Sequence, residues 1–530
     1  MYLLIPGRHQ LLTVFQAQYL KSILVKGIQH FPDIDGKPLS SDDPVTAIIF
    51  AVTSANHSNT RRNPLSFYLR ALAIQDFARE MKVPTYIYGI DDVGHLSNFA
   101  SYALKQVKHD SEGMFDLRAG NCAVVCSTPV LEMYEQLGFR ILPAELKDRR
   151  DWSHATRLPW DFVEAIAQHA NWEEDDDLVN DIHASSLDLY RKYKLDRKVQ
   201  LLFKDRMISE DGDITTTRDY NTYVRQMDEI AGLKYSDTAN YVRAGRIGDI
   251  GCAVGSWIKL ACRDERFRES DFYGIEVARH LFDICHQRKH NGDFANPFVF
   301  FSQRNAVTGL VFDERSMNTI HTSSLTHEIE SYGSRRDLLN FIANRFQELV
   351  SGGVWINRDV VGPPDGNKLI LMKLHDSDGR NDDFDNEFSS REQLAEYLRG
   401  LSTRARFFRF VRDFRKHEGY SLQYTQLEFG SQKYIELRLR DACEFMSRKD
   451  YVDNWESEMH ETFCFWDFEE WTRQVEAVGF SVSPLSRAYT NEWIVANRLR
   501  DKVELFEREA DKLLTIPYPV TNMIMLAERK

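Results

Sequence analysis

The sequence predicts an α/β protein with two parallel-sheet domains, and three observations support this fold class. Short apolar runs alternate with helical patterns over residues 1–145, and the same alternation begins again near Arg246. Strand–helix alternation at this spacing is typical of βαβ units, in which helices cover a parallel sheet. The third observation is a glycine-rich turn after the first strand of the second region, where such sheets bind ligands.

The first predicted domain covers residues 1–150. Its strand candidates are unbroken apolar runs, as expected for strands that are buried on both faces. They are Tyr2–Ile5, Ala47–Val52, Thr85–Tyr88, Ala123–Cys126 and Phe139–Leu142, with helical patterns over 10–28, 65–81, 92–108 and 129–137 between them. We expect a helical linker region over 151–220, in which the acidic stretch 173–181 forms a domain edge.

The second predicted domain covers residues 221–530. Its strand candidates are Ile247–Ile250, Phe272–Ile275, Phe298–Phe301, Thr319–Thr322, Val354–Ile356, Phe480–Val482 and Met523–Ala527. A helical pattern over Phe468–Val478 is closed by Gly479, a residue that commonly ends helices. We expect a helical insertion near 376–465, which begins with the polar loop 376–388.

Composition narrows the class of protein. The 530 residues carry a formal net charge of −13, which counts against a large nucleic-acid surface, because such surfaces need an excess of basic residues. The seven cysteines form no CxxC pair, so we expect reduced thiols in a cytoplasmic protein. Neither a signal peptide nor a membrane span is expected. The sequence does not predict the oligomeric state.

The strongest local signal is the segment Arg246–Trp257, which reads RIGDIGCAVGSW. Gly251 and Gly255 lack Cβ atoms, so the backbone can turn tightly and approach a ligand closely. Asp249 ends the strand before the turn. Glu276 ends the next strand, where a carboxylate can accept hydrogen bonds from both hydroxyls of a ribose. Asn305 follows the third strand, where an amide can pair with an adenine edge.

These residues resemble motif I of the class I methyltransferases that use S-adenosylmethionine (SAM), with Ala253 where glycine is usual. The segments 321–333, 349–355, 475–482 and 522–530 resemble later elements of the same fold. The resemblance covers roughly 220–530 and implies a seven-stranded Rossmann-like sheet with SAM as cofactor. A nicotinamide-type domain is the alternative, but the turn lacks GxGxxG. The implied cofactor-binding residues are Asp249, Gly251, Cys252, Ala253, Gly255, Glu276, Asn305 and Ser323.

Candidates for a catalytic base follow the fourth strand of this sheet. They are His327, Glu328 and Glu330, and a base is needed if the methyl acceptor is a hydroxyl. An ordinary structural role in the loop or in a helix cap remains open for each. A metal site built from His321, His327 and Glu330 lacks diagnostic spacing, so we expect no metal. Residues 455–461 are a second candidate on the acceptor side, or an ordinary amphipathic helix.

The N-terminal segment Gly7–Gln16 resembles the start of nucleotidyltransferases of the HUP superfamily. Thr13 stands at the first H/T position of their motif, and Gln16 replaces its second histidine. The segment Thr60–Ser66 with Arg70 resembles their R-x-N-P element, in which a helix start and an arginine bind phosphate. The resemblance implies nucleotide binding by Gly7, Arg8, Thr13, Gln16, Arg62, Asn63 and Arg70.

Three interpretations of the first domain stay open. Glutamine at position 16 carries no charge, so the domain is a nucleotide-binding module that has lost catalysis, unless His9 replaces the missing histidine. The third interpretation is that the domain serves only as a scaffold.

The sequence thus predicts a SAM-dependent methyltransferase that acts on a small-molecule or nucleotide-linked acceptor, with a nucleotide bound by its N-terminal domain. A bifunctional nucleotidyltransferase and methyltransferase is one alternative. An RNA-modifying methyltransferase is another, because arginines and aromatic residues alternate over 404–415, as in proteins that bind single strands. RNA is not the favoured partner, because the formal net charge of the chain is −13.

Overall fold

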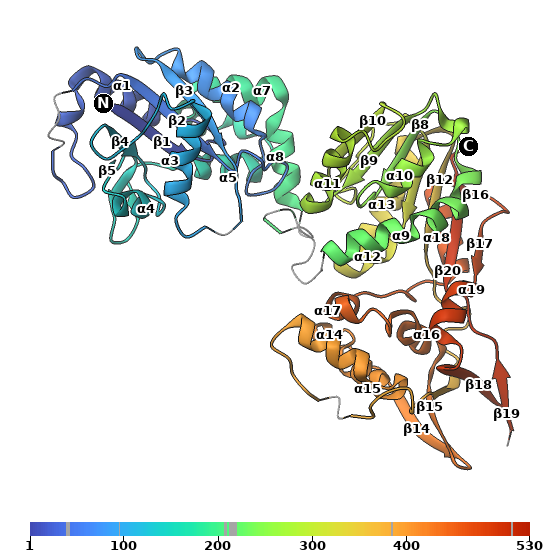
Figure 1. Ribbon diagram of the computed structural model, residues 1–530. Helices are drawn as coiled ribbons and strands as arrows, with labels where there is room; N and C mark the ends of the chain where they lie inside the picture. Colours follow the sequence, from blue (N-terminus) through green and yellow to red (C-terminus); the bar gives the residue numbers. More distant parts are fainter. Residues whose placement is uncertain are drawn as a thin grey trace. The chain divides into compact units, whose positions relative to one another are not determined.

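The computed structural model describes residues 1–530 except 39–42, 95, 206–208, 211, 213–219, 383–384 and 510–511. The chain forms two compact units. The first comprises Met1–Arg206 with Glu210–Gly212, and the second comprises Met207–Ser209 with Asp213–Lys530 (Figure 1).

The first unit contains a parallel five-stranded sheet of order β3-β2-β1-β4-β5. Its strands are β1 (Tyr2–Gly7), β2 (Ala47–Thr53), β3 (Thr85–Ile90), β4 (Cys122–Val125) and β5 (Arg140–Leu142). Helices α1 (Val14–Lys26), α2 (Phe67–Ala78), α3 (Phe99–Asp110) and α4 (Leu131–Gln136) connect them. Alternate residues of β2 enter two separate apolar clusters, Ile48 in one and Ile49 in the other, so both faces of the sheet are covered. The predicted α/β fold class is confirmed here.

Within the region 151–220, residues 151–205 belong to the first unit and are not a linker. After the short hairpin β6 (Leu146–Asp148) and β7 (Ser153–His154), the chain forms α5 (Pro159–Gln168), α6 (Asp176–Asp181), α7 (Ala184–Tyr193) and α8 (Leu195–Lys204). These helices complete the apolar cluster on one face of the sheet, through buried residues such as Phe162, Leu189 and Val199. The acidic stretch misled the prediction because Trp172 and Leu178 bury their side chains between charged neighbours.

The main sheet of the second unit has the order β10-β9-β8-β11-β12-β20-β16, with β17 also paired to β20. Its strands are β8 (Arg246–Ile250), β9 (Asp271–Glu276), β10 (Val299–Gln303), β11 (Met317–Ser323), β12 (Leu349–Val360), β16 (Ser481–Val482), β17 (Arg487–Tyr489) and β20 (Asn522–Glu528). Strands β8 to β12 run parallel, and β20 is antiparallel to β12. This confirms the fold class that the methyltransferase resemblance implies.

Helices of the second unit flank this sheet (Figure 1). They are α9 (Tyr220–Thr238), α10 (Ser256–Ala261), α11 (Arg279–His290), α12 (Thr326–Tyr332), α13 (Arg335–Glu348) and α18 (Phe468–Val478). Helix α18 spans the predicted residues and ends at Gly479, whose φ of +113° is the left-handed conformation that favours glycine.

The insertion is wider than predicted, and it is not only helical. Residues 361–467 and 490–521 together form what we call the accessory lobe. It has an antiparallel sheet of order β14-β15-β13-β18-β19 and its own apolar core, which contains Phe407, Phe445 and Leu505. Its elements are β13 (Leu369–Leu374), α14 (Arg391–Gly400), α15 (Thr403–Asp413), β14 (Tyr424–Phe429), β15 (Gln432–Arg438), α16 (Leu439–Arg448), α17 (Trp455–Glu458), α19 (Glu492–Ile494), η7 (Val495–Leu499), β18 (Val503–Glu509) and β19 (Lys512–Ile516).

Among the residues that the structure describes, no helix is long and apolar enough to cross a membrane. All seven cysteines are buried and free, in agreement with the predicted reduced thiols.

Candidate active site

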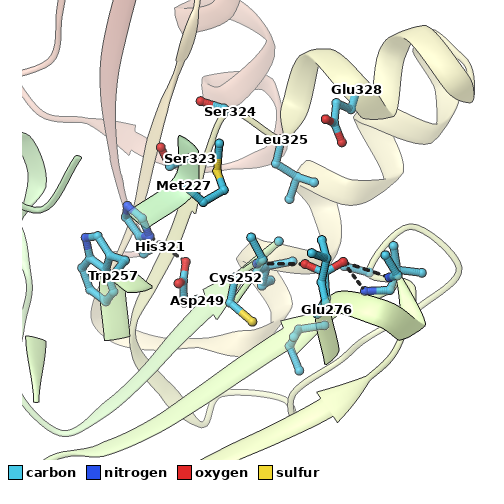
Figure 2. Close-up of a pocket in the computed structure, with 18 of the residues that line it drawn as sticks. Met227, Asp249, Cys252, Trp257, Glu276, His321, Ser323, Ser324, Leu325 and Glu328 are labelled. Atoms are coloured by element: carbon cyan, nitrogen blue, oxygen red, sulfur yellow. Dashed lines mark hydrogen bonds and ion pairs between the residues drawn. The ribbon is translucent and has the colours of Figure 1, made fainter. Parts of the chain in front are cut away.

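A cavity opens at the carboxyl ends of β8, β9 and β11 in the second unit (Figure 2). It encloses about 1160 Å³ of space, including its open mouth. Of the predicted cofactor-binding residues, those that line it are Asp249, Gly251, Cys252, Ala253, Glu276, Asn305 and Ser323. The structure therefore brings these seven residues together around one cavity, and their contact with a cofactor stays a prediction.

Gly255 does not line the cavity. A Cβ atom at this position would lie 3.2 Å from the rings of Phe294 and Phe301, and its φ of +74° is left-handed. Gly255 therefore does not contact a cofactor in this cavity, contrary to the prediction from the sequence. It shapes the turn instead, as the residue that precedes the first residue of α10.

The turn itself depends on left-handed backbone at Gly251 (φ +71°) and Ala253 (φ +49°). A Cβ at Gly251 would lie 3.1 Å from a methyl group of Leu325, so the loop after β11 closes over this glycine. Alanine at 253 keeps the conformation that the usual glycine would adopt, at a cost in backbone strain of about 1–2 kcal/mol.

Glu276 holds the turn against the next strand. One oxygen of its carboxylate accepts a hydrogen bond from the amide of Ala253 at 2.8 Å, and the other accepts from the amides of Val277 and Ala278 at 2.8 and 2.9 Å. Burial raises the pKa of this carboxyl to about 7, although these amides lower it. Three of the roughly four lone-pair sites of the carboxylate are thus occupied, and about one remains for a hydroxyl donor in the cavity.

Asp249 is paired with a residue from the neighbouring strand. His321 Nδ1 lies 2.7 Å from its carboxylate, and the imidazole stacks on Trp257 with the ring centroids 4.2 Å apart (Figure 2). The second ring nitrogen of His321 and the hydroxyl of Ser323 are buried, and neither has a hydrogen-bond partner in the part of the chain that the structure describes. Buried polar atoms are rarely left unsatisfied, so these two atoms indicate a polar ligand in the cavity.

Only one of the three catalytic candidates reaches the cavity. Glu328 lines it, whereas His327 and Glu330 do not. Glu330 instead accepts a hydrogen bond from the hydroxyl of Thr462 at 2.8 Å and pairs with Arg335 at 2.8 Å. Glu330 therefore fastens α12 to the accessory lobe, which corrects its predicted role.

His327 is an internal ion-pair partner. Its Nδ1 lies 2.6 Å from Asp359, and its Nε2 lies 3.4 Å from Glu461. Burial alone lowers the pKa of the imidazole, but the two carboxylates raise it well above its ordinary value of 6.5. Donor atoms of His327, Glu328 and Glu461 lie within 4.8 Å of one another, a spacing that could hold a metal. Because both ring nitrogens of His327 face carboxylates, we interpret its side chain as a protonated imidazole that is held by ion pairs. Glu461, the last residue of the candidate segment 455–461, therefore contacts His327.

The sequence indicated helix in the region of α9 but did not predict that this helix borders the cavity. Met227, Ala231 and Lys234 of α9 line it, together with Tyr332 of α12. One signal was present in the sequence, since α9 directly precedes the strand that carries the glycine turn.

The first unit has its own cavity at the carboxyl ends of β1, β2 and β4. It encloses about 2120 Å³ of space, including its open mouth, and its lining includes Gly7, Arg8, Gln16 and Arg62. Thr13, Asn63 and Arg70 do not line it. Thr13 and Gln16 cap α1 reciprocally, and the amide of Asn63 donates to the hydroxyl of Thr60 at 3.0 Å.

Arg70 is fully buried, and it holds the backbone rather than a phosphate. Its guanidinium donates to the carbonyls of Arg8, Thr53 and Ser54 at 2.8–2.9 Å. His9 lines the cavity, but burial lowers its pKa to about 4. It is therefore neutral near pH 7 and does not supply the positive charge of the missing histidine.

The arginine-rich segment 404–415 forms α15 and the turn after it. Phe407 and Phe410 are buried in the core of the accessory lobe. Arg406 pairs with Asp450, Arg409 with Asp413, and Arg412 with Glu387. The segment thus presents no row of exposed rings, so it does not favour the RNA alternative.

A scan against protein-family models gives no match, and neither does a search of curated proteins. Among solved structures, a putative SAM-dependent methyltransferase from Listeria monocytogenes matches this chain with 11% identity and a TM-score of 0.29. The match covers 57% of this chain and 100% of the Listeria chain. A geranyl diphosphate C-methyltransferase from Streptomyces coelicolor, in complex with Mg²⁺, geranyl diphosphate and S-adenosylhomocysteine, matches 60% of this chain and 85% of its own at 10% identity and a TM-score of 0.31. Identities of this size concern the fold alone.

Proposed function

We propose that the second unit binds SAM and transfers its methyl group to a small-molecule or nucleotide-linked acceptor. The supporting observation is the pair of buried carboxylates, Asp249 and Glu276, which end adjacent parallel strands on either side of a turn with left-handed backbone. This arrangement offers acceptors for an ammonium group at Asp249 and for a sugar hydroxyl at Glu276 in one cavity.

The residues present fit this cofactor. Glu276 keeps acceptor capacity toward the ribose, and Ser323 contributes a buried hydroxyl that has no partner among the described residues. Met227, Ile250 and Leu281 give the cavity apolar walls, which suit an adenine ring and a thioether chain.

SAM supplies a methyl group that is already activated by its sulfonium, so the chain mainly has to position the acceptor. The acceptor atom forms the new bond to the methyl carbon while the carbon–sulfur bond breaks and its electron pair stays on sulfur. Where the acceptor is a hydroxyl, we assign removal of its proton to Glu328, the one predicted base that lines the cavity.

Titration of the full chain with S-adenosylhomocysteine tests this assignment. We expect Asp249→Ala and Glu276→Ala each to weaken binding at least about tenfold, because each removes a buried acceptor. Glu269→Ala, an exposed residue just before β9, is the matched control and should leave affinity unchanged. Unchanged affinity in both cavity variants would overturn the site.

For the first unit, we propose nucleotide binding without nucleotidyl transfer. The cavity at the strand ends is flanked by Arg8 and Arg62, whose guanidinium groups suit phosphate. Neither the neutral His9 nor Gln16 supplies the charge that transfer requires.

Equilibrium titration with ATP tests the nucleotide proposal. Arg62→Gln should weaken binding several-fold, whereas Arg118→Gln, a largely exposed arginine outside the cavity, should not. Release of pyrophosphate from ATP in the presence of phosphorylated acceptors would instead support the bifunctional alternative.

A further inference from the structure

A second cavity lies beside the proposed cofactor cavity, within the same unit. It encloses about 970 Å³ of space, including its mouth, and Lys234 and Ser324 line both cavities. Its walls come from α9, the end of β12, α16 of the accessory lobe and the segment 491–499. A molecule in this second cavity would therefore reach the cofactor cavity at Lys234 and Ser324.

The lining of this cavity is mainly apolar and aromatic. Met446, Phe463, Ile494 and Val520 contribute to it, and Trp493 does so with more than half of its surface exposed. A ring system could pack against such walls.

The charged residues of the lining all have the same sign. They are Lys234, Arg358 and Arg498, and no aspartate or glutamate that the structure describes lines the cavity. This is unusual in a chain whose formal net charge is −13. The cavity therefore favours an anion, because like charges are costly to hold together and, among the described residues, only Arg358 has a carboxylate at ion-pair distance.

Two of these three cations form no ion pair with a described residue, although Asp450 and Glu458 act on Arg498 from beyond ion-pair distance. Arg358 pairs with Asp237 at 2.8 Å. Among the described residues, no carboxylate lies within 4.0 Å of Lys234 or Arg498, and Arg498 lies over the rings of Tyr451 and Trp493 at 4.5 and 5.5 Å. Burial lowers the pKa of the Lys234 amine to about 8, so the amine is still mainly protonated at neutral pH.

We propose that this second cavity binds the methyl acceptor, and that the acceptor is a small ring-bearing molecule with an anionic group. Arg498 holds the anion, the apolar walls hold the ring, and the reacting atom lies at the junction formed by Lys234 and Ser324. This inference rests on the proposed methyltransferase function, which supplies the donor on the other side of the junction.

Two fluorescent probes of nearly the same shape test the preference for an anion. They are 8-anilinonaphthalene-1-sulfonate, which is anionic, and N-phenyl-1-naphthylamine, which lacks the sulfonate. We expect the full chain to bind the anionic probe at least about tenfold more tightly. Arg498→Gln should remove most of that difference, and Arg498→Lys should largely restore it. Arg473→Gln, an exposed arginine of α18, is the control and should change neither affinity.

A blocking variant locates the probes. Ser447→Trp places a large ring in the cavity and should weaken the binding of both probes, with an unchanged circular dichroism spectrum. Equal affinities for the two probes, or anionic binding that is insensitive to Arg498→Gln and to Ser447→Trp, would overturn the inference.

Titration of the same samples with S-adenosylhomocysteine tests the proposed cofactor binding separately from the proposed class of acceptor. Arg498→Gln should leave this affinity unchanged, because Arg498 does not line the cofactor cavity. Failure of the wild-type chain to bind S-adenosylhomocysteine would refute the proposed function, whereas normal binding combined with no probe selectivity would refute only the acceptor class.

Discussion

The imidazole of His321 lies between the carboxylate of Asp249, at 2.7 Å from Nδ1, and the indole of Trp257, on which it stacks. Asp249 ends one strand, His321 comes from the strand beside it, and Trp257 follows the glycine turn. This three-residue contact fixes the direction of the Asp249 carboxylate at the floor of the cavity.

His321→Phe should keep the stacking on Trp257 but leave the buried Asp249 carboxylate without its partner. We expect the free energy of unfolding of the second unit to fall by about 1–3 kcal/mol in urea titrations. His290→Phe, at an exposed position, should change it by less than about 0.5 kcal/mol. An equally small change in His321→Phe would show that the pair contributes nothing to stability.

Substitutions at Ala253 should separate backbone strain from chemistry. Ala253→Gly suits the φ of +49° and should keep the affinity for S-adenosylhomocysteine within about twofold. Ala253→Val should lower the stability by about 1–3 kcal/mol, because β-branched residues are strained in this region. Urea unfolding and calorimetric titration measure the two effects. Equal stability of the valine and glycine variants would contradict the left-handed turn.

Glu276 should make stability depend on pH in a predictable direction. Its pKa of about 7 in the folded state lies above its ordinary value of 4.5, so the folded chain keeps a proton that the unfolded chain has lost between these values. The contribution of this group to stability therefore falls as the pH rises from about 4.5 to 7, by roughly 1–3 kcal/mol.

The comparison with Glu276→Gln isolates that effect, since other titrating groups cancel. The difference in free energy of unfolding, wild type minus variant, should decrease between pH 5 and pH 8. A difference that rises with pH would contradict the assigned shift.

The ion pair of His327 and Asp359 should be a major stabilising contact. The raised pKa of His327 means that its contribution is complete below pH 6.5 and is lost only as the pH rises through the much higher value of the folded state. Burial alone raises the pKa of Asp359, but His327 lowers it to about 2, so its contribution is present above pH 3.8 and is lost as the pH falls through 2.

At pH 6 both contributions are intact. His327→Leu should therefore lower the free energy of unfolding by about 3–5 kcal/mol, because it leaves buried carboxylates without a counterion. Arg473→Leu breaks the exposed pair with Glu470 and should cost less than about 1 kcal/mol. Equal effects of the two substitutions in urea unfolding at pH 6 would refute the role of the buried pair.

Much of the fold was predictable because apolar periodicity is a local signal. The strands that end in Asp249 and Glu276, and the helix that ends at Gly479, lie where the sequence predicts them. The accessory sheet was not predicted, since strands such as β14 have weak apolar alternation. Its central strand β13 pairs with β18, which lies far along the chain and leaves no local signal in the sequence.

The floor of the site was predictable for the same local reason, whereas its walls were not. Asp249, Glu276 and the turn lie within a short segment of sequence. Arg70 and His327 carry the residue types of phosphate binding and catalysis, yet each is consumed by contacts with distant segments of the chain. Arg498 and Lys234 are separated by more than 260 positions, and only folding brings them to one cavity.

Parallel calorimetric titrations of the full chain with S-adenosylhomocysteine and with NAD⁺ test whether the cavity at Asp249 and Glu276 binds SAM. We expect binding of S-adenosylhomocysteine at one site per chain, competition by SAM, and no heat from NAD⁺. Binding of NAD⁺ in this cavity, or no binding of S-adenosylhomocysteine, would contradict this expectation.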